Sequence, residues 1–243
     1  MRLTTEEILH NSFVVTIDNE RISIFNEWFS KQNLLLPHKF VGYEMDDSYL
    51  VGQFQTLIKL KQKENFAILN NELNIFHALA NNASHWSIVQ LAMFNEMPFV
   101  TIFEDDAKPV ENLKERLDNL CYDIPDETDV LRLGYTTHFK RITKQEVIDS
   151  AVPHSDNLIV KNFSGSHAYI VFSKYYERFI AENKHSPRCD FDKINPTSDK
   201  NVFALKESLF NQVNLINRSV ISSWKREDGS IIRKNNKTQK PLL

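Results

Sequence analysis

The sequence has few of the residues that make a chain flexible or cross-linked. Of 243 residues only 5 are glycine and 8 are proline, which argues against disorder and long linkers. The two cysteines, Cys121 and Cys189, have no CxxC spacing, so we expect neither a disulfide framework nor a zinc site, but thiols in a reducing compartment. Hydrophobic residues at 42% and charged residues at 25% are typical of a globular domain with a full core.

Long apolar runs and a strong charge of one sign are also missing. No stretch of about 18 apolar residues predicts a membrane span, and the opening "MRLTTEEILHNSF" has no apolar signal core. These features predict a cytoplasmic protein. The net charge of −3 provides no strong basic field, so nucleic acid is not an expected partner.

The charge is unevenly distributed along the chain. Residues 225–243 hold six Lys or Arg and two acids, a local net of +4, so the remainder carries −7. This segment has little apolar periodicity and is predicted to be a basic tail. One interpretation is a solvated terminus, and the other is peripheral contact with an anionic inner membrane, worth about 1 kcal/mol per basic residue near the surface.

Strand and helix patterns alternate along the chain. The helical pattern at residues 73–96 is interrupted near "NNAS", which predicts that Ser84 is the N-cap of a second helix. Ser173 is likewise a predicted N-cap, and residues 136–161 are predicted to be irregular loops. The remaining apolar runs predict strands at residues 12–18, 38–42, 98–103, 129–135 and 166–172, and helices at 20–33, 112–120 and 173–183. The alternation predicts an α/β fold with a wound, mostly parallel sheet and flanking helices.

Three adjacent acids end the most apolar strand pattern, in "PFVTIFEDDAKP". Glu104, Asp105 and Asp106 would repel one another near a low-dielectric core. In wound sheets, ligands bind beyond the carboxyl ends of the strands, where these acids are expected to lie. Hard cations bind carboxylate oxygens and offset such repulsion, so the pattern predicts a Mn²⁺ or Mg²⁺ site that also holds a phosphate group. An acidic loop that merely solvates the strand end is the alternative.

Seven segments resemble, in order, those of glycosyltransferase family 25, which includes bacterial lipooligosaccharide galactosyltransferases. The similarity covers roughly residues 12–222, and "FVTIFEDDAKP" and "ASHWSIVQLA" match the family's acidic and Ser-His motifs. The other matching segments are "VVTIDNERISIFNEWF", "FVGYE", "DVLRLGY", "GSHAYIVFSKYYERFI" and "FNQVNLINRSVI".

The resemblance implies a GT-A type fold and an inverting transfer of a hexose, usually galactose, from a UDP-sugar. The acceptor implied is a bacterial lipooligosaccharide or lipopolysaccharide, an oligosaccharide or glycolipid. Residues 1–224 are expected to form one domain, with a nucleotide-sugar half near residues 1–110 and an acceptor half near 111–224, followed by the tail at 225–243. A nucleotidyltransferase, or a non-catalytic carbohydrate-binding or assembly protein, are the alternatives.

The resemblance also implies roles for individual residues. Asp106, with Glu104, is expected to hold the metal ion, while Asp105 lies near the ribose or sugar. An inverting transferase needs a carboxylate base on the acceptor side, and "PRCDFDKINP" supplies Asp190 and Asp192. The predicted contacts to the nucleotide sugar are Thr16, Arg21, Ser84 and His85, and His167 is expected to complete the metal shell or meet the acceptor. The alternative roles are a surface arginine for Arg21, an N-cap for Ser84 and a core histidine for His85.

Overall fold

The structure is a computed structural model that describes residues 3–43, 72–119, 124–135, 151–152, 155–159, 165–184 and 201–213. The chain divides into two units, Met1–Val213 and Asn214–Leu243, and every described residue belongs to the first. The expected domain boundary at residue 224 therefore lies outside the described residues and stays a prediction.

The first unit is built on an eight-stranded mixed sheet with the order β2-β1-β3-β8-β5-β9-β7-β6. β1 pairs in parallel with both β2 and β3, and β5 pairs in parallel with β9, whereas β8 and β7 run against their neighbours. The strands are β1 (Ser12–Thr16), β2 (His38–Val41), β3 (Phe99–Glu104), β5 (Val130–Arg132), β6 (Ala151–Val152), β7 (Ser155–Ile159), β8 (Ala168–Phe172) and β9 (Val202–Leu205). A separate two-stranded sheet pairs β4 (Ala107–Pro109) with β10 (Phe210–Gln212).

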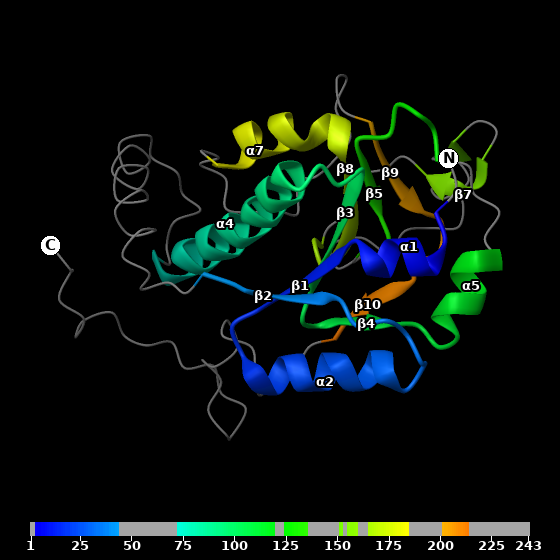
Figure 1. Ribbon diagram of the computed structural model, residues 1–243, viewed down its shortest axis with the longest axis horizontal. Helices are drawn as coiled ribbons and strands as arrows, with labels where there is room; N and C mark the ends of the chain where they lie inside the picture. Colours follow the sequence, from blue (N-terminus) through cyan, green and yellow to red (C-terminus); the bar gives the residue numbers. More distant parts are fainter. Residues whose placement is uncertain are drawn as a thin grey trace, which may run out of the picture. The chain divides into compact units, whose positions relative to one another are not determined.

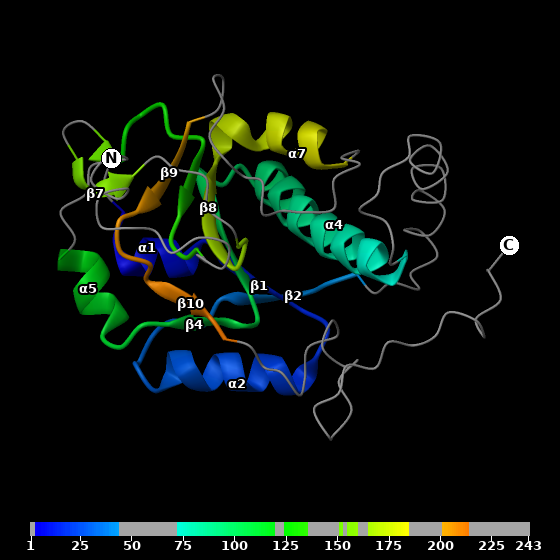
Figure 2. The same ribbon diagram turned by 180° about the vertical axis from the view of Figure 1, so that it is seen from behind.

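Helices cover both faces of the large sheet. On one face α4 and α7 lie side by side, and α2 lies on the other (Figure 1; Figure 2 shows the reverse view). The helices are α1 (Thr5–His10), α2 (Asn19–Ser30), α4 (Glu72–Phe94), α5 (Leu113–Asn119) and α7 (Tyr176–Lys184), with a 3₁₀ turn η1 (Ser173–Tyr175) before α7. Among the described helices, none is long and apolar enough to cross a membrane.

The two faces follow from the alternation of side chains along each strand. In β1, Val14 packs into the cluster that includes α2, and Val15 packs into the cluster that includes α4. In β3, Phe103 and Ile102 divide in the same way. The continuous apolar run of β3 is explained by this arrangement, because a central strand covered on both faces is buried on both.

The predicted α/β class, with a wound, mostly parallel sheet and flanking helices, is confirmed. The predicted break in the helix at residues 73–96 is wrong, because α4 runs without interruption through Ser84. Ser173 is not an N-cap: it begins the 3₁₀ turn, whose cap is Phe172 with no side-chain hydrogen bond. The segment 136–161 is not all irregular, since its described part holds β6 and β7.

Candidate functional site

The acidic residues lie where the strand order of the sheet reverses. From β1 the chain goes through α2 to β2 on one side, and α4 then leads to β3 on the other side of β1. Because α2 and α4 cover opposite faces, the carboxyl ends of β1 and β3 form the switch point at which such sheets usually bind ligands. Val15 pairs with Glu104 in the register, so the end of β1 lies directly beside the acids.

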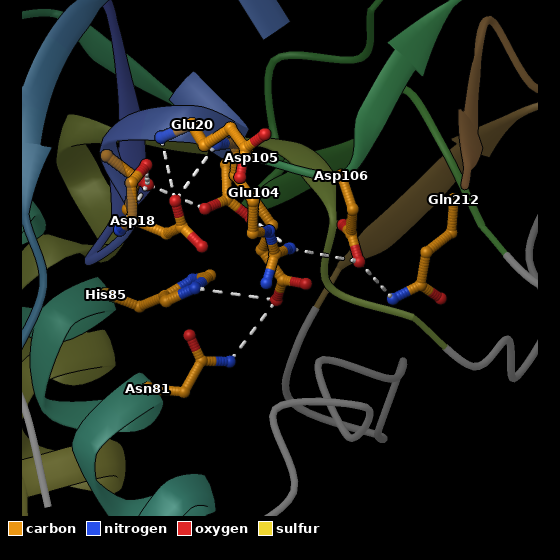
Figure 3. Close-up of polar contacts among 10 residues, drawn as sticks. Asp18, Glu20, Asn81, His85, Glu104, Asp105, Asp106 and Gln212 are labelled. Atoms are coloured by element: carbon orange, nitrogen blue, oxygen red, sulfur yellow. Dashed lines mark hydrogen bonds and ion pairs between the residues drawn. The ribbon is translucent and has the colours of Figure 1, made fainter. Parts of the chain in front are cut away.

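The three adjacent carboxylates turn toward three different parts of the molecule. Glu104 meets side chains of α4, Asp105 meets the end of β1 and the first turn of α2, and Asp106 meets β10. Figure 3 shows Asn81 and His85 reaching from α4 toward Glu104, and Asp106 turned toward Gln212. The acids are separated because Glu104 is the last residue of β3, whereas Asp105 and Asp106 lie in the turn between β3 and β4.

Asp105 is held by a hydroxyl and a guanidinium. The Thr16 hydroxyl donates to Asp105 Oδ2 over 2.7 Å, and Arg21 Nη2 forms an ion pair with Asp105 Oδ1. The Asp18 side chain caps α2, whose first turn carries Arg21, by accepting from the backbone N–H of Glu20 and of Arg21. Burial raises the pKa of Asp105 to about 6, while Arg21 and Thr16 act in the opposite direction.

Glu104 faces a buried polar group on the α4 side of the sheet. Its Oε1 accepts from the Ser166 hydroxyl at 2.7 Å and from Asn81 Nδ2 at 3.3 Å, and His85 Nε2 lies 3.6 Å away. His85 Nδ1 in turn lies 2.7 Å from the hydroxyl of Tyr169.

The protonation states of this group are set by burial. Burial lowers the pKa of His85 to about 4 despite the nearby charge of Glu104, so the imidazole is neutral at pH 7. Burial also raises the pKa of Tyr169 well above its ordinary value, so its hydroxyl keeps its proton and can donate to His85 Nδ1. With Nδ1 accepting, the proton of the neutral ring is on Nε2, the nitrogen that faces Glu104.

Of the three acids, Asp106 is the one with a buried side-chain oxygen that lacks a partner among the described residues. Its Oδ2 accepts from Gln212 Nε2 at 3.3 Å and lies 3.7 Å from Arg21 Nη2. Its Oδ1 is buried and has no hydrogen-bond partner among the described residues. Burial and the neighbouring Glu104 raise the pKa of Asp106, against the opposing effect of Arg21. A buried carboxylate oxygen without a donor is a position where a cation or a donor group of a ligand would be stabilised.

The described residues suit a cation that brings other ligands with it. Within these ranges no group of three His, Cys, Asp or Glu side chains is placed to hold a metal ion. Mg²⁺, however, is commonly bound by one or two carboxylates, with substrate phosphates and waters completing the shell. Asp106 Oδ1 meets that need, whereas both oxygens of Asp105 are engaged by Thr16 and Arg21.

The structure brings Thr16, Arg21 and His85 to the acids, but it gives Ser84 a different environment. Ser84 lies inside α4 and is not an N-cap: its hydroxyl donates to the carbonyl of Ala80 at 2.8 Å, one turn earlier in the helix. The same oxygen accepts from the backbone N–H of Tyr43 at 3.0 Å, just beyond the end of β2. There is accordingly no helix N-terminus at this position to attract a phosphate. Ser84 instead links α4 to the segment after β2 through its hydrogen bond with Tyr43.

His167 is fully buried and lies directly before β8, beside Glu104. Its Nε2 donates to the carbonyl of Phe210 at 3.0 Å, because a carbonyl oxygen can only accept. It packs against Gly134, where an added Cβ would lie 2.5 Å from the same nitrogen. The backbone carbonyl of His167 also accepts from the N–H of Glu104. The side chain of His167 thus attaches β10 to the large sheet, and its backbone carbonyl holds the end of β3 beside the start of β8.

Four further residues of the site were not singled out by the sequence analysis. Asn81 and Ser166 hold Glu104, and Gln212 holds Asp106. Arg132 is fully buried at the end of β5 and donates to the carbonyl of Gly165, directly before Ser166. Only the polar type of Arg132, inside the apolar "DVLRLGY", could have drawn attention to it. The predicted bases Asp190 and Asp192 lie outside the described residues.

Comparison with known proteins identifies no family. No family model and no curated protein matches the sequence. Among solved structures, one match is the crystal structure of a glycosyltransferase involved in the glycosylation of the major capsid of PBCV-1. The identity is 9% and the TM-score is 0.34, over 71% of this chain and 64% of that chain. The chain thus spans slightly less than two thirds of the length of that structure.

Proposed function

We propose that the protein is a GT-A type glycosyltransferase that moves a hexose, galactose, from a UDP-sugar to an oligosaccharide or glycolipid acceptor of lipooligosaccharide type. The observation that carries the proposal is the position of Glu104, Asp105 and Asp106 at the point where the strand order reverses, beside the end of β1. The choice of sugar and acceptor rests on the resemblance of the sequence motifs to glycosyltransferase family 25.

The roles proposed for the residues follow from their contacts. Asp106, through its open Oδ1, is the residue that would hold Mn²⁺ or Mg²⁺, with Glu104 as a second carboxylate nearby. When bound, the cation offsets the charge that develops on the leaving diphosphate. Thr16, Asp105 and Arg21 line the end of β1, where the ribose and the diphosphate would meet them.

The transfer also needs a base on the acceptor side. In a single inverting displacement the acceptor oxygen forms a bond to the anomeric carbon while the bond to the diphosphate breaks. The hydroxyl proton passes to a carboxylate on the acceptor side. We assign this role to Asp190 or Asp192 from the sequence. The Asp105–Arg21 pair and the Glu104 group are already engaged within the protein.

The start of α2 favours the glycosyltransferase over a nucleotidyltransferase. Phosphate loops of such enzymes use glycines and open backbone N–H groups, but the turn from Thr16 to Arg21 contains no glycine. Its backbone N–H groups at Glu20 and Arg21 are already bonded to the Asp18 carboxylate. An anion would have to displace this carboxylate.

The test is a panel of radiolabelled UDP-sugars incubated with Mn²⁺, with and without a lipooligosaccharide acceptor. We expect release of UDP and transfer of one sugar, galactose. Asp106→Asn should reduce transfer by roughly 100-fold or more, because a charge-stabilising contact to the leaving group is lost. Either Asp190→Asn or Asp192→Asn should keep UDP binding and lose transfer by about 100-fold.

The matched control is Glu115→Gln, an exposed acid on α5 that is not among the site residues, which should transfer at the rate of the wild type. Turnover of nucleoside triphosphates with release of pyrophosphate would instead identify a nucleotidyltransferase. Saccharide binding without turnover of any UDP-sugar would identify the non-catalytic binding protein.

A further inference from the structure

Arg21 already provides a positive charge at the acidic end of β3. It lies in the first turn of α2, and its Nη2 contacts Asp105 Oδ1 and approaches Asp106 Oδ2 to 3.7 Å. The Arg21 side chain is only 11% exposed. A guanidinium remains charged at any working pH, so the protein itself offsets the repulsion between the two aspartates.

Asp106 and Arg21 nevertheless each keep one buried polar atom without a hydrogen-bond partner among the described residues. Asp106 Oδ1 is a buried acceptor with no donor, and Arg21 Nε is a buried donor with no acceptor among the described residues. A bound cation would satisfy the first atom and an anion the second. A buried polar atom without a partner costs free energy. Together the two atoms favour a ligand that carries both a positive and a negative charge.

A free divalent cation does not match these needs. Arg21 already lies against Asp105 and 3.7 Å from Asp106, so its positive charge would repel a free cation there. Other carboxylate oxygens nearby already accept hydrogen bonds. Asp105 Oδ2 is bonded to Thr16, and Glu104 Oε1 is bonded to Ser166 and Asn81. A nucleoside diphosphate would bring phosphate oxygens to complete the shell of the cation and an anionic partner for Arg21.

We propose that Arg21 is an internal counter-ion that prevents a free divalent cation from binding at Asp106, the residue proposed to hold the metal. The site would then take the cation and the nucleoside diphosphate together, as one complex. This inference rests on the proposed function for the identity of the diphosphate. It assigns to Arg21 two alternative partners, the aspartates in the free protein and the diphosphate in the complex.

The experiment measures Mn²⁺ binding to the full chain by calorimetry, with and without UDP. The wild type should bind Mn²⁺ weakly alone and at least tenfold more tightly with UDP. Since coupling between two ligands is reciprocal, Mn²⁺ should increase UDP affinity by the same factor. In Arg21→Gln, Mn²⁺ alone should bind at least tenfold more tightly than to the wild type, and Arg21→Lys, which keeps the charge, should restore weak binding.

The matched control is Arg116→Gln, which removes an arginine that pairs with Glu207 on the surface and should leave Mn²⁺ binding unchanged. The proposal is overturned if Mn²⁺ alone binds the wild type and Arg21→Gln equally well, or binds neither. Independent binding of Mn²⁺ and UDP to the wild type also overturns it, and this measurement needs no variant. Failure of the proposed function gives a different result: no UDP-sugar turns over, whatever the affinities for Mn²⁺ alone.

Discussion

The two faces of the central sheet use the same strands for different purposes. The face that packs on α2 is apolar, and the rings of Phe25, Phe29, Phe103 and Phe210 pack together there with centroids 4.4 to 6.4 Å apart. The face that packs on α4 has a comparable apolar cluster, but polar residues replace it toward the carboxyl end of β3. There His85, Tyr169 and Glu104 lie in contact, and His85 and Tyr169 are completely or almost completely buried.

The difference indicates a division of roles. An apolar face gains stability from each buried side chain without any requirement on hydrogen bonding. A buried polar group needs a partner for each donor and acceptor, and it contributes little net stability even when these are present. We infer that the α2 face holds the fold together, while the polar end of the α4 face keeps Glu104 in place at the expense of apolar packing.

The largest effect is expected on the α2 face. Phe103→Ala should decrease the free energy of unfolding by about 3–5 kcal/mol, because it leaves a cavity among closely packed rings. Tyr169→Phe on the α4 face should cost less, about 1–3 kcal/mol, because it removes one hydroxyl and leaves His85 Nδ1 without its donor. Urea denaturation of both variants measures the difference, and a greater loss in Tyr169→Phe would contradict the division of roles.

Because of the buried His85 at the polar end of the α4 face, the stability of the protein should depend on pH. The pKa of His85 is about 4 in the folded protein because of burial, below the ordinary 6.5. Neutral His85 therefore contributes stability that is complete above pH 6.5 and is lost as the pH falls toward 4. The stability difference between wild type and His85→Gln should shrink by about 2 kcal/mol between pH 6.5 and pH 5.

Urea denaturation of both proteins in the presence of EDTA, from pH 7.5 to pH 5, gives this difference directly. Subtracting the variant from the wild type removes the contributions of the carboxylates that titrate in the same range. A difference that stays constant over that range would show that His85 is not buried in the neutral form.

A smaller effect is expected where β10 joins the large sheet. In Gly134→Ala the new Cβ would lie 2.5 Å from His167 Nε2 and 2.7 Å from the carbonyl of Phe210, so these groups must move apart. We expect a loss of about 1–3 kcal/mol, as for other overpacked positions. The control is Gly42→Ala, whose Cβ meets only side chains at 3.2 Å and should cost less. Equal thermal unfolding temperatures for the two variants would argue against a tight His167–Phe210 contact.

Local pattern was sufficient to predict most of the first half of the fold. The strands at β1, β2 and β3 and the helix α2 were predicted from apolar spacing, and the strand-end position of the three acids followed from it. The pattern failed at "NNAS", where polar residues suggested a helix end. There Asn82 donates to the carbonyl of Asn183 in α7, and the Ser84 hydroxyl donates to the carbonyl of Ala80, so contacts that the sequence does not display accompany the continuous helix.

The sequence by itself determined that three carboxylates follow a buried strand, because the apolar run and the acids are adjacent in the chain. Only the tertiary structure decided what each carboxylate meets. Arg21, Asn81, Ser166 and Gln212 come from four separate segments. Their approach depends on strand order and on which face each helix covers. A local pattern encodes the period of side chains along one segment, but the pairing of distant segments depends on the packing of the whole sheet.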